Sequence, residues 1–189
     1  MKEIKELYLK HRCQATYDHV VKVAIVASKL AKKYQLDTKK CYLASLLHDI
    51  SAIITPDQMY QIARHRQLKI DPAEEKYHFL LHQRISRIIA KEYFKIDDEK
   101  ILSAIECHTT LKKQASDYDK VVFLADKLAW DQAGVPPYYD KVCQALKISL
   151  DYACYIYLKY QFDHHCFLMV HQWLDEAYRQ LSRKFRLEK

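Results

Sequence analysis

A chain of 189 residues is long enough to bury a core without cross-links. It contains only one glycine and four prolines, the residues that build tight turns, and this scarcity argues against a strand-rich fold. No apolar run approaches the roughly 20 residues of a membrane span, and Met1 to Lys10 is not a secretion signal, so we expect a soluble cytoplasmic protein with six reduced cysteines. The formal net charge of +7 favours anionic partners, but the basic residues are dispersed, which argues against nucleic acid.

Apolar residues recur at helical spacing along most of the chain, and caps and prolines divide them into separate helices. The helix after the Asp37-Thr38 cap is apolar nearly all round, so we expect it at the centre of a bundle. The sequence predicts helices over Tyr17 to Tyr34, Cys41 to His48, Pro56 to about Gln67, Tyr77 to Phe94, Lys100 to His108, Tyr118 to Trp130, Tyr139 to Tyr160 and His165 to Phe185.

The break at Gly134 to Pro137 is the clearest punctuation in the sequence. Neither side alone would bury its apolar faces, so we interpret it as a loop within one all-α domain spanning residues 1–189. In that domain a core of about residues 15–130 carries the candidate site, and a C-terminal helical extension covers about 138–187. The aromatic residues of this extension predict core packing or a homodimer surface.

Six side chains of the types that bind divalent cations are distributed over the predicted helices, in the order His, His-Asp, His, His, Asp: His19, His48, Asp49, His82, His108 and Asp126. A histidine on an apolar helix face can equally be a hydrogen-bonded core residue, and adjacent helical residues such as His48 and Asp49 point about 100° apart. Together, however, the six are better explained by one metal site than by six costly buried polar groups. A bridging carboxylate would allow two cations and the hydrolysis of a phosphorylated small molecule.

The motifs around these residues resemble those of the HD-domain phosphohydrolase superfamily, and within it the YqeK-like branch. They are Tyr17-Asp18-His19, Leu46-Leu47-His48-Asp49, His82, His108-Thr109-Thr110 and Leu124-Ala125-Asp126-Lys127. The resemblance implies an all-α HD-domain bundle and symmetrical hydrolysis of diadenosine tetraphosphate to two ADP at an iron-containing site. It also implies that His19, His48, Asp49 and Asp126 hold one divalent ion. His82 and His108 would then hold a second ion, bridged to the first by Asp49. Manganese, zinc or magnesium are alternatives to iron.

Catalytic and substrate-binding roles also follow from the resemblance. It implies that His48 and Asp49 act together with Lys22 and Thr109 in catalysis. Lys22, Thr109 and Lys127 are the candidate substrate contacts at these motifs, and Arg84, at a position where the chain departs from the family, is a further candidate that could compensate for missing basic residues. Alternatively, Lys22 is a solvated lysine and Thr109 caps a helix end.

The chain departs from the branch at positions near these motifs. Thr16 and Ala52 replace basic residues, Gln83-Arg84 replaces Gly-Pro, Leu111 replaces Gly, and Ala129-Trp130-Asp131-Gln132 replaces a Glu-Pro-x-Arg loop. Since remote contacts decide which substrate is turned over, these changes should alter substrate choice more than metal binding. The sequence thus predicts a metal-dependent phosphohydrolase of a nucleotide or dinucleoside polyphosphate. The alternative is a non-catalytic, nucleotide-sensing module with a structural metal site.

Overall fold

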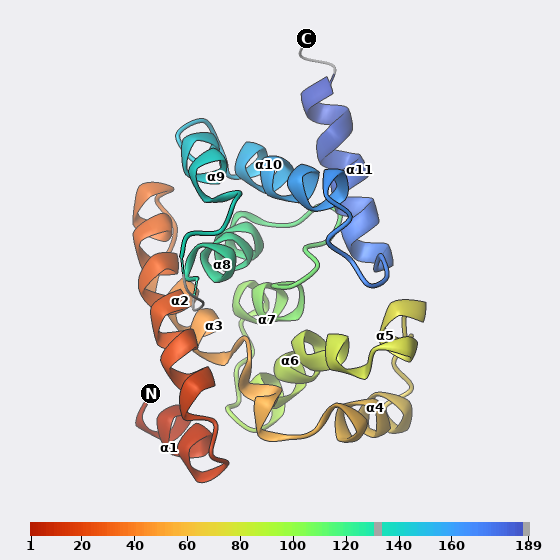
Figure 1. Ribbon diagram of the computed structural model, residues 1–189. Coiled ribbons are helices and arrows are strands. Elements are labelled where there is room, and N and C mark those ends of the chain that lie inside the picture. The colour runs from red at the N-terminus through yellow and green to blue at the C-terminus, as the bar shows by residue number, and fades with distance from the viewer. Residues whose placement is uncertain (131–133, 187–189) are drawn as a thin grey trace.

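Helices make up the regular structure of the computed structural model, which describes residues 1–130 and 134–186, and no strand occurs in those ranges, as predicted (Figure 1). The α-helices are α1 (Lys2–Lys10), α2 (Gln14–Lys33), α3 (Thr38–Leu47), α4 (Pro56–His65), α5 (Pro72–Lys76), α6 (His82–Glu92), α7 (Glu99–Glu106), α8 (Asp117–Leu128), α9 (Tyr139–Ala145), α10 (Leu150–Asp163) and α11 (Gln172–Arg186). Two 3-10 helices, η1 (Ile50–Ile53) and η2 (His78–Leu81), lie between them.

Three of the expected helices differ from the structure. The long helix over Tyr139 to Tyr160 was wrong: the chain breaks before Ser149, whose hydroxyl accepts from the Tyr152 amide (3.0 Å) and starts α10 as a separate helix. The helix expected from Tyr77 opens instead with the tighter turn η2. The last helix begins at Gln172, because His165 adopts a left-handed φ of 50° that a helix cannot include.

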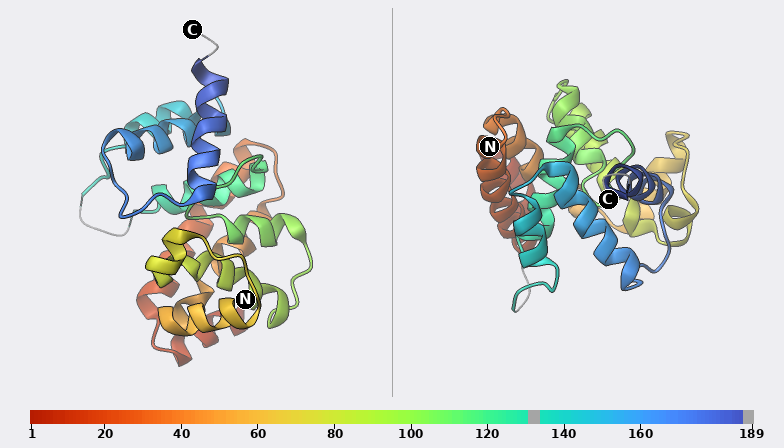
Figure 2. Two further views of the ribbon diagram at one scale, coloured as in Figure 1. Left: turned by 90° about the vertical axis from the view of Figure 1, so that its right-hand side faces the viewer. Right: turned by 90° about the horizontal axis from the view of Figure 1, so that it is seen from above.

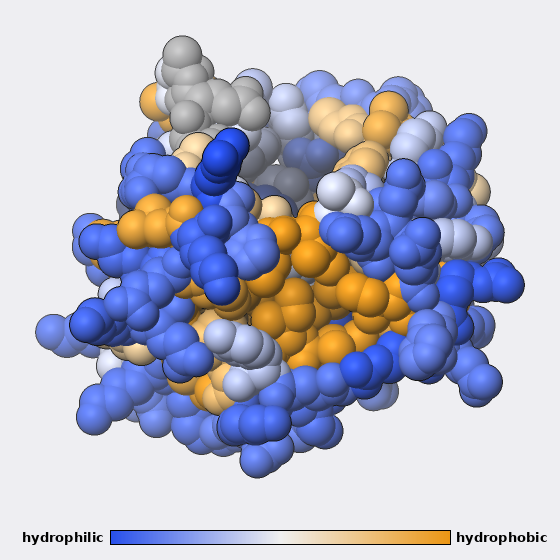
Figure 3. Space-filling view, turned by 90° about the horizontal axis from the view of Figure 1, so that it is seen from below, coloured by the Kyte–Doolittle hydropathy of each residue, from blue (hydrophilic) through white to orange (hydrophobic). Residues whose placement is uncertain are grey.

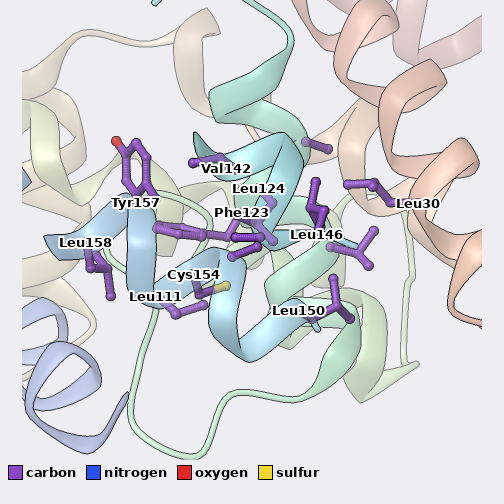
Figure 4. Close-up of a cluster of buried hydrophobic side chains, with 14 of the residues drawn as sticks. Leu30, Leu111, Phe123, Leu124, Val142, Leu146, Leu150, Cys154, Tyr157 and Leu158 are labelled. Carbon is purple, nitrogen blue, oxygen red and sulfur yellow. The ribbon is translucent and has the colours of Figure 1, made fainter. Parts of the chain in front are cut away.

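Helices α3, α7 and α8 lie at the centre of the molecule, with α2 along the left side of Figure 1, α1 and α4 at the lower end and α9 to α11 at the upper end. Figure 2 shows the same arrangement from two other directions. The largest apolar cluster joins α2 and α8 to the C-terminal helices α9, α10 and α11. In this cluster the rings of Phe123 from α8 and Tyr157 from α10 pack edge to face, 5.3 Å apart (Figure 4). The C-terminal helices therefore share a core with the helices that carry the candidate site.

An apolar area gathers on the face seen from below, the end of the molecule at which α1 and α4 lie (Figure 3). A groove between α4 and α6 is lined by isoleucines, among them Ile54, Ile62, Ile85, Ile88 and Ile89. No helix in the described parts of the chain is long and apolar enough to cross a membrane. All six cysteines are free thiols.

Leu111 occupies a backbone conformation that usually selects glycine. Its φ is 57°, in the left-handed region, and its side chain is only 1% exposed within the largest apolar cluster. At this position the YqeK-like pattern has a glycine, which the chain replaces with leucine. The turn therefore keeps its left-handed geometry, while the leucine side chain contributes to the core.

Replacing Leu111 with glycine should lower the free energy of unfolding, although it relieves the strain of the left-handed backbone conformation. Relief of the left-handed strain is worth about 1–2 kcal/mol, whereas removing a buried leucine side chain costs about 2–5 kcal/mol. We expect a net loss of about 2 kcal/mol in the free energy of unfolding, measured by urea denaturation. Gln67→Gly is the matched control, because Gln67 has a similar φ of 53° but is exposed, so its replacement should not destabilise. A Leu111→Gly protein as stable as the parent would contradict this account.

Candidate metal centre

Six side chains, predicted from the sequence as ligands, come together from five parts of the chain. His19 lies in α2, His48 and Asp49 follow α3, His82 begins α6, His108 follows α7, and Asp126 lies near the end of α8. Two overlapping groups of ligand atoms result, one of His19, His48 and Asp126 and the other of His48, Asp49 and His108. In each group all ligand atoms lie within 4.8 Å of one another.

Asp126 is the acidic residue of the first group. Its Oδ1 lies 3.0 Å from Nε2 of His19 and 3.5 Å from Nε2 of His48. Its Oδ2 accepts from Lys127 Nζ at 2.6 Å. One oxygen is thus directed to the imidazoles and the other to a half-buried ammonium group.

Asp49 lies between the two sets of histidines. Its Oδ2 is 3.3 Å from Nε2 of His48, while Oδ1 is 3.3 Å from Nε2 of His108 and 3.6 Å from Nε2 of His82. The Nε2 atoms of His82 and His108 are themselves 2.9 Å apart. Each carboxylate oxygen therefore faces a different set of imidazoles, as a bridging ligand would.

The three central histidines are oriented by the same local contact. Nδ1 of His48, His82 and His108 lies 2.7, 2.7 and 2.8 Å from the carbonyl oxygen three residues earlier, in Ser45, Phe79 and Ile105 respectively. The Ser45 and Ile105 carbonyls lie in the last turns of α3 and α7, where intrahelical partners are missing, whereas the Phe79 carbonyl also accepts from the His82 amide. Because a carbonyl oxygen can only accept, each Nδ1 carries the proton that it donates, and each Nε2 faces the centre.

This arrangement fits a divalent cation. Nε2 of His48 is buried, and it has no hydrogen-bond partner among the residues that the structure describes. Nε2 of His82 faces Nε2 of His108, and the Nδ1 bonds of these two rings leave a lone pair on each facing atom. Nitrogen atoms 2.9 Å apart can both reach one cation, since metal–nitrogen bonds are about 2.0–2.1 Å long. A cation would satisfy all three atoms.

The charges of the centre are strongly coupled. Burial lowers the pKa of His48, but the adjacent Asp49 and Asp126 outweigh it and raise that pKa to about 10. Burial and repulsion from His48 lower the pKa of His108 to about 4. Although burial opposes ionisation, the His48 charge holds the pKa of Asp49 well below its ordinary value, and Lys127 does the same for Asp126. Without metal, the centre at neutral pH therefore holds two carboxylates and a protonated His48.

The candidate substrate contacts are placed very differently. Lys22 is exposed on α2, one turn beyond His19. The Thr109 hydroxyl lies 2.9 Å from Nε2 of His82. Lys127 is occupied by Asp126, and Arg84 donates to the carboxylate of buried Glu74 and to the Lys69 carbonyl, both at 2.8 Å.

Positions where the sequence departs from the family pattern are distributed around the centre. Ala52 is exposed in η1, while Asp131 and Gln132 lie outside the described residues. His171 lies 3.5 Å from Glu74, and its Nδ1 accepts from the Trp173 amide at 3.0 Å.

Gln83 is a residue whose contribution the sequence did not reveal. It replaces a glycine of the family pattern, and it is fully buried and hydrogen-bonded to the segment that follows His108. Because Gln83 lies away from the apolar stripe of Ile85, Ile88 and Ile89, the helical pattern gives no signal that it is buried.

The comparisons with known proteins agree with this geometry. The HD domain family model matches residues 16–131. A symmetrical bis(5'-nucleosyl)-tetraphosphatase of Staphylococcus aureus is 34% identical over 67% of this chain and 64% of its own length. The Bacillus subtilis protein of the same name is 28% identical over 79% of this chain and 77% of its own length.

A solved structure is similar along nearly the whole chain. It is that of a predicted HD superfamily hydrolase involved in NAD metabolism from Clostridium acetobutylicum. The TM-score is 0.85 at 27% identity, and the match covers 97% of both chains. The chain thus belongs to the HD-domain family, and it is a metal-dependent phosphohydrolase of that family.

Metal binding should be coupled to proton release. The proton on His48 is held up to about pH 10 in the metal-free centre, and the imidazole must lose it to become a ligand. We therefore expect the affinity for manganese(II) to rise about tenfold per pH unit between about pH 7 and 8.5, measured by calorimetric titration. His78→Asn should leave this slope unchanged, because His78 lies outside the centre beside Asp57. An affinity independent of pH would contradict the proton competition.

Proposed function

We propose that this chain hydrolyses a dinucleoside polyphosphate, with symmetrical cleavage of diadenosine tetraphosphate by water to two ADP as the best candidate. The position of Asp49, with one oxygen toward His48 and the other toward His82 and His108, is the observation that carries the proposal. The names of the Staphylococcus aureus and Bacillus subtilis relatives support the choice of substrate. The net charge of +7 suits such a polyanion.

The residues would divide the ligand positions between two cations. His19, His48 and Asp126 would hold one, His82 and His108 the other, and Asp49 would bind both. When bound, two such cations polarise a phosphate group and lower the pKa of water between or beside them. Four imidazoles with two carboxylates suit iron, manganese or zinc better than magnesium, and we propose iron.

Thr109 and Lys22 would contact the phosphates. The Thr109 hydroxyl lies 2.9 Å from Nε2 of His82 and can donate to it. Once that nitrogen is a ligand, the hydroxyl can donate to a phosphate oxygen instead. Lys22 is exposed one helical turn from His19 and can place its ammonium group on an outer phosphate. We propose both as substrate contacts.

Arg84 and Lys127 would act mainly through their neighbours. Lys127 bonds Oδ2 of Asp126, which keeps that carboxylate ionised and leaves Oδ1 toward the imidazoles. The Arg84 guanidinium is engaged by Glu74, so a phosphate would have to compete with a buried carboxylate for it. For this reason we give Arg84 a smaller part in substrate binding than Lys22.

Asp49→Asn is the sharpest test of the bridging role. It keeps the shape of the side chain but removes the charge and one acceptor oxygen. With diadenosine tetraphosphate and iron(II) or manganese(II), we expect kcat to fall by on the order of a hundredfold or more, measured as ADP release. Asp57→Asn, on the exposed surface of α4, is the matched control and should retain full activity.

A panel of substrates then separates the remaining possibilities. Mononucleotides, other dinucleoside polyphosphates and a generic phosphodiester should be turned over more slowly than the tetraphosphate. Faster turnover of another phosphate compound would replace the substrate but not the enzyme class. Bound metal without turnover of any compound would instead support a nucleotide-sensing module.

A further inference from the structure

Gln83 connects the segments that carry two of the candidate ligands. Its side chain is 0% exposed and follows His82 directly in α6. Its Oε1 accepts from the backbone amides of Thr109 (3.1 Å) and Thr110 (3.3 Å), and its Nε2 donates to the Thr110 hydroxyl (3.1 Å). Because backbone amides can only donate, they fix the orientation of the Gln83 amide group.

The segment bound by Gln83 has no helix of its own to hold it. Residues 107–110 form a turn after α7, and the next residue, Leu111, has the left-handed φ of 57°. This turn presents both His108 and Thr109 to His82, at 2.9 Å in each case between side-chain atoms. The hydrogen bonds of Gln83 therefore act where two ligands from different helices must keep a fixed distance.

A buried serine pair joins α6 to the Asp49 segment as well. The Ser51 hydroxyl donates to the carbonyl oxygen of His82 (2.9 Å), and the Ser51 amide donates to the hydroxyl of Ser86 (3.1 Å). Asp49, His82 and His108 are thus linked through one polar network around the start of α6.

The first ligand group is held differently. His19 and Asp126 come from α2 and α8, whose neighbouring residues Val23, Ala27, Leu124 and Ala125 are all completely buried in the largest apolar cluster. Their relative position depends on apolar packing between long helices and includes no contact with Gln83 among the described hydrogen bonds.

We propose that Gln83 is a positioning residue that sets the distance between His82 and His108 and thereby the affinity for the second cation, without affecting the first. The inference rests on the proposed function for the existence of that second cation. A residue with only a structural role would instead weaken both metal positions in proportion to the loss of stability.

Gln83→Met tests the proposal, because methionine has a similar length but cannot accept from Thr109 and Thr110. Each purified protein is dialysed against manganese(II), and bound metal is counted by mass spectrometry and electron paramagnetic resonance. We expect two ions per chain in the wild type, with the spectrum of a coupled pair. In Gln83→Met we expect an unchanged first ion, a second bound on the order of 10- to 100-fold more weakly, and an uncoupled spectrum.

Ile85→Ala is the matched control for general loosening. Ile85 is buried on the same helix but packs against α4 residues such as Met59 and Ala63. Both variants are compared by thermal unfolding. If Ile85→Ala weakens the second ion as much as Gln83→Met does, or if Gln83→Met binds both ions normally, the proposal is overturned.

A milder variant covers the case in which Gln83→Met does not fold. Thr110→Val removes the hydroxyl that accepts from Gln83 and should weaken the second ion in the same direction by a smaller factor. Normal binding of both ions by Thr110→Val would then overturn the proposal. Since metal counting needs no substrate, a wild type that binds two ions but hydrolyses nothing would reject the proposed function alone. A wild type that binds one ion would reject the inference as well.

Discussion

The position of the Asp49 carboxylate constrains the rest of the structure. Its two oxygens face imidazoles from opposite sides, so the chain must leave α3 directly after His48 and turn into η1. Helices α6 and α7 must then end or begin where their histidines reach the same carboxylate. A charge at this depth is costly unless it is paired, and the neighbouring imidazoles of His48 and His108 offset that cost. The bundle can thus be understood as the set of helix ends that converge on one acidic residue.

The chain solves the orientation problem with helix termini. His48, His82 and His108 each follow a short helix, and each ring bonds the carbonyl three residues earlier, so one local contact selects the protonated nitrogen of each ring. No second carboxylate is needed to orient these rings. The backbone therefore sets the orientation of these three rings. Gln83 and the Ser51–Ser86 pair then have to fix only the distances between the segments that carry them.

The all-α class, most helices and the six convergent residues could be predicted because they depend on periodicity and residue type. The break before Ser149 could not be predicted, because Leu146 and Leu150 continue the apolar pattern across it. Only the serine cap marks the start of the new helix. The sequence also could not show that Arg84 is held by Glu74 or that Gln83 is buried. Both depend on which face of α6 meets which neighbour, and this is decided by tertiary packing between segments distant in the chain.

The ion pair between Lys127 and Asp126 has an electrostatic consequence for the loaded enzyme. Because one of the two carboxylates is already balanced by an ammonium group, the centre would retain a marked surplus of positive charge after taking up two divalent ions. Neutral histidines add nothing to offset it. Such a centre would attract anions even though basic side chains such as the one replaced by Ala52 are missing. The attraction of a polyphosphate would then come chiefly from the metal ions themselves. Selection among polyphosphates would then depend on the shape of the entrance rather than on charge.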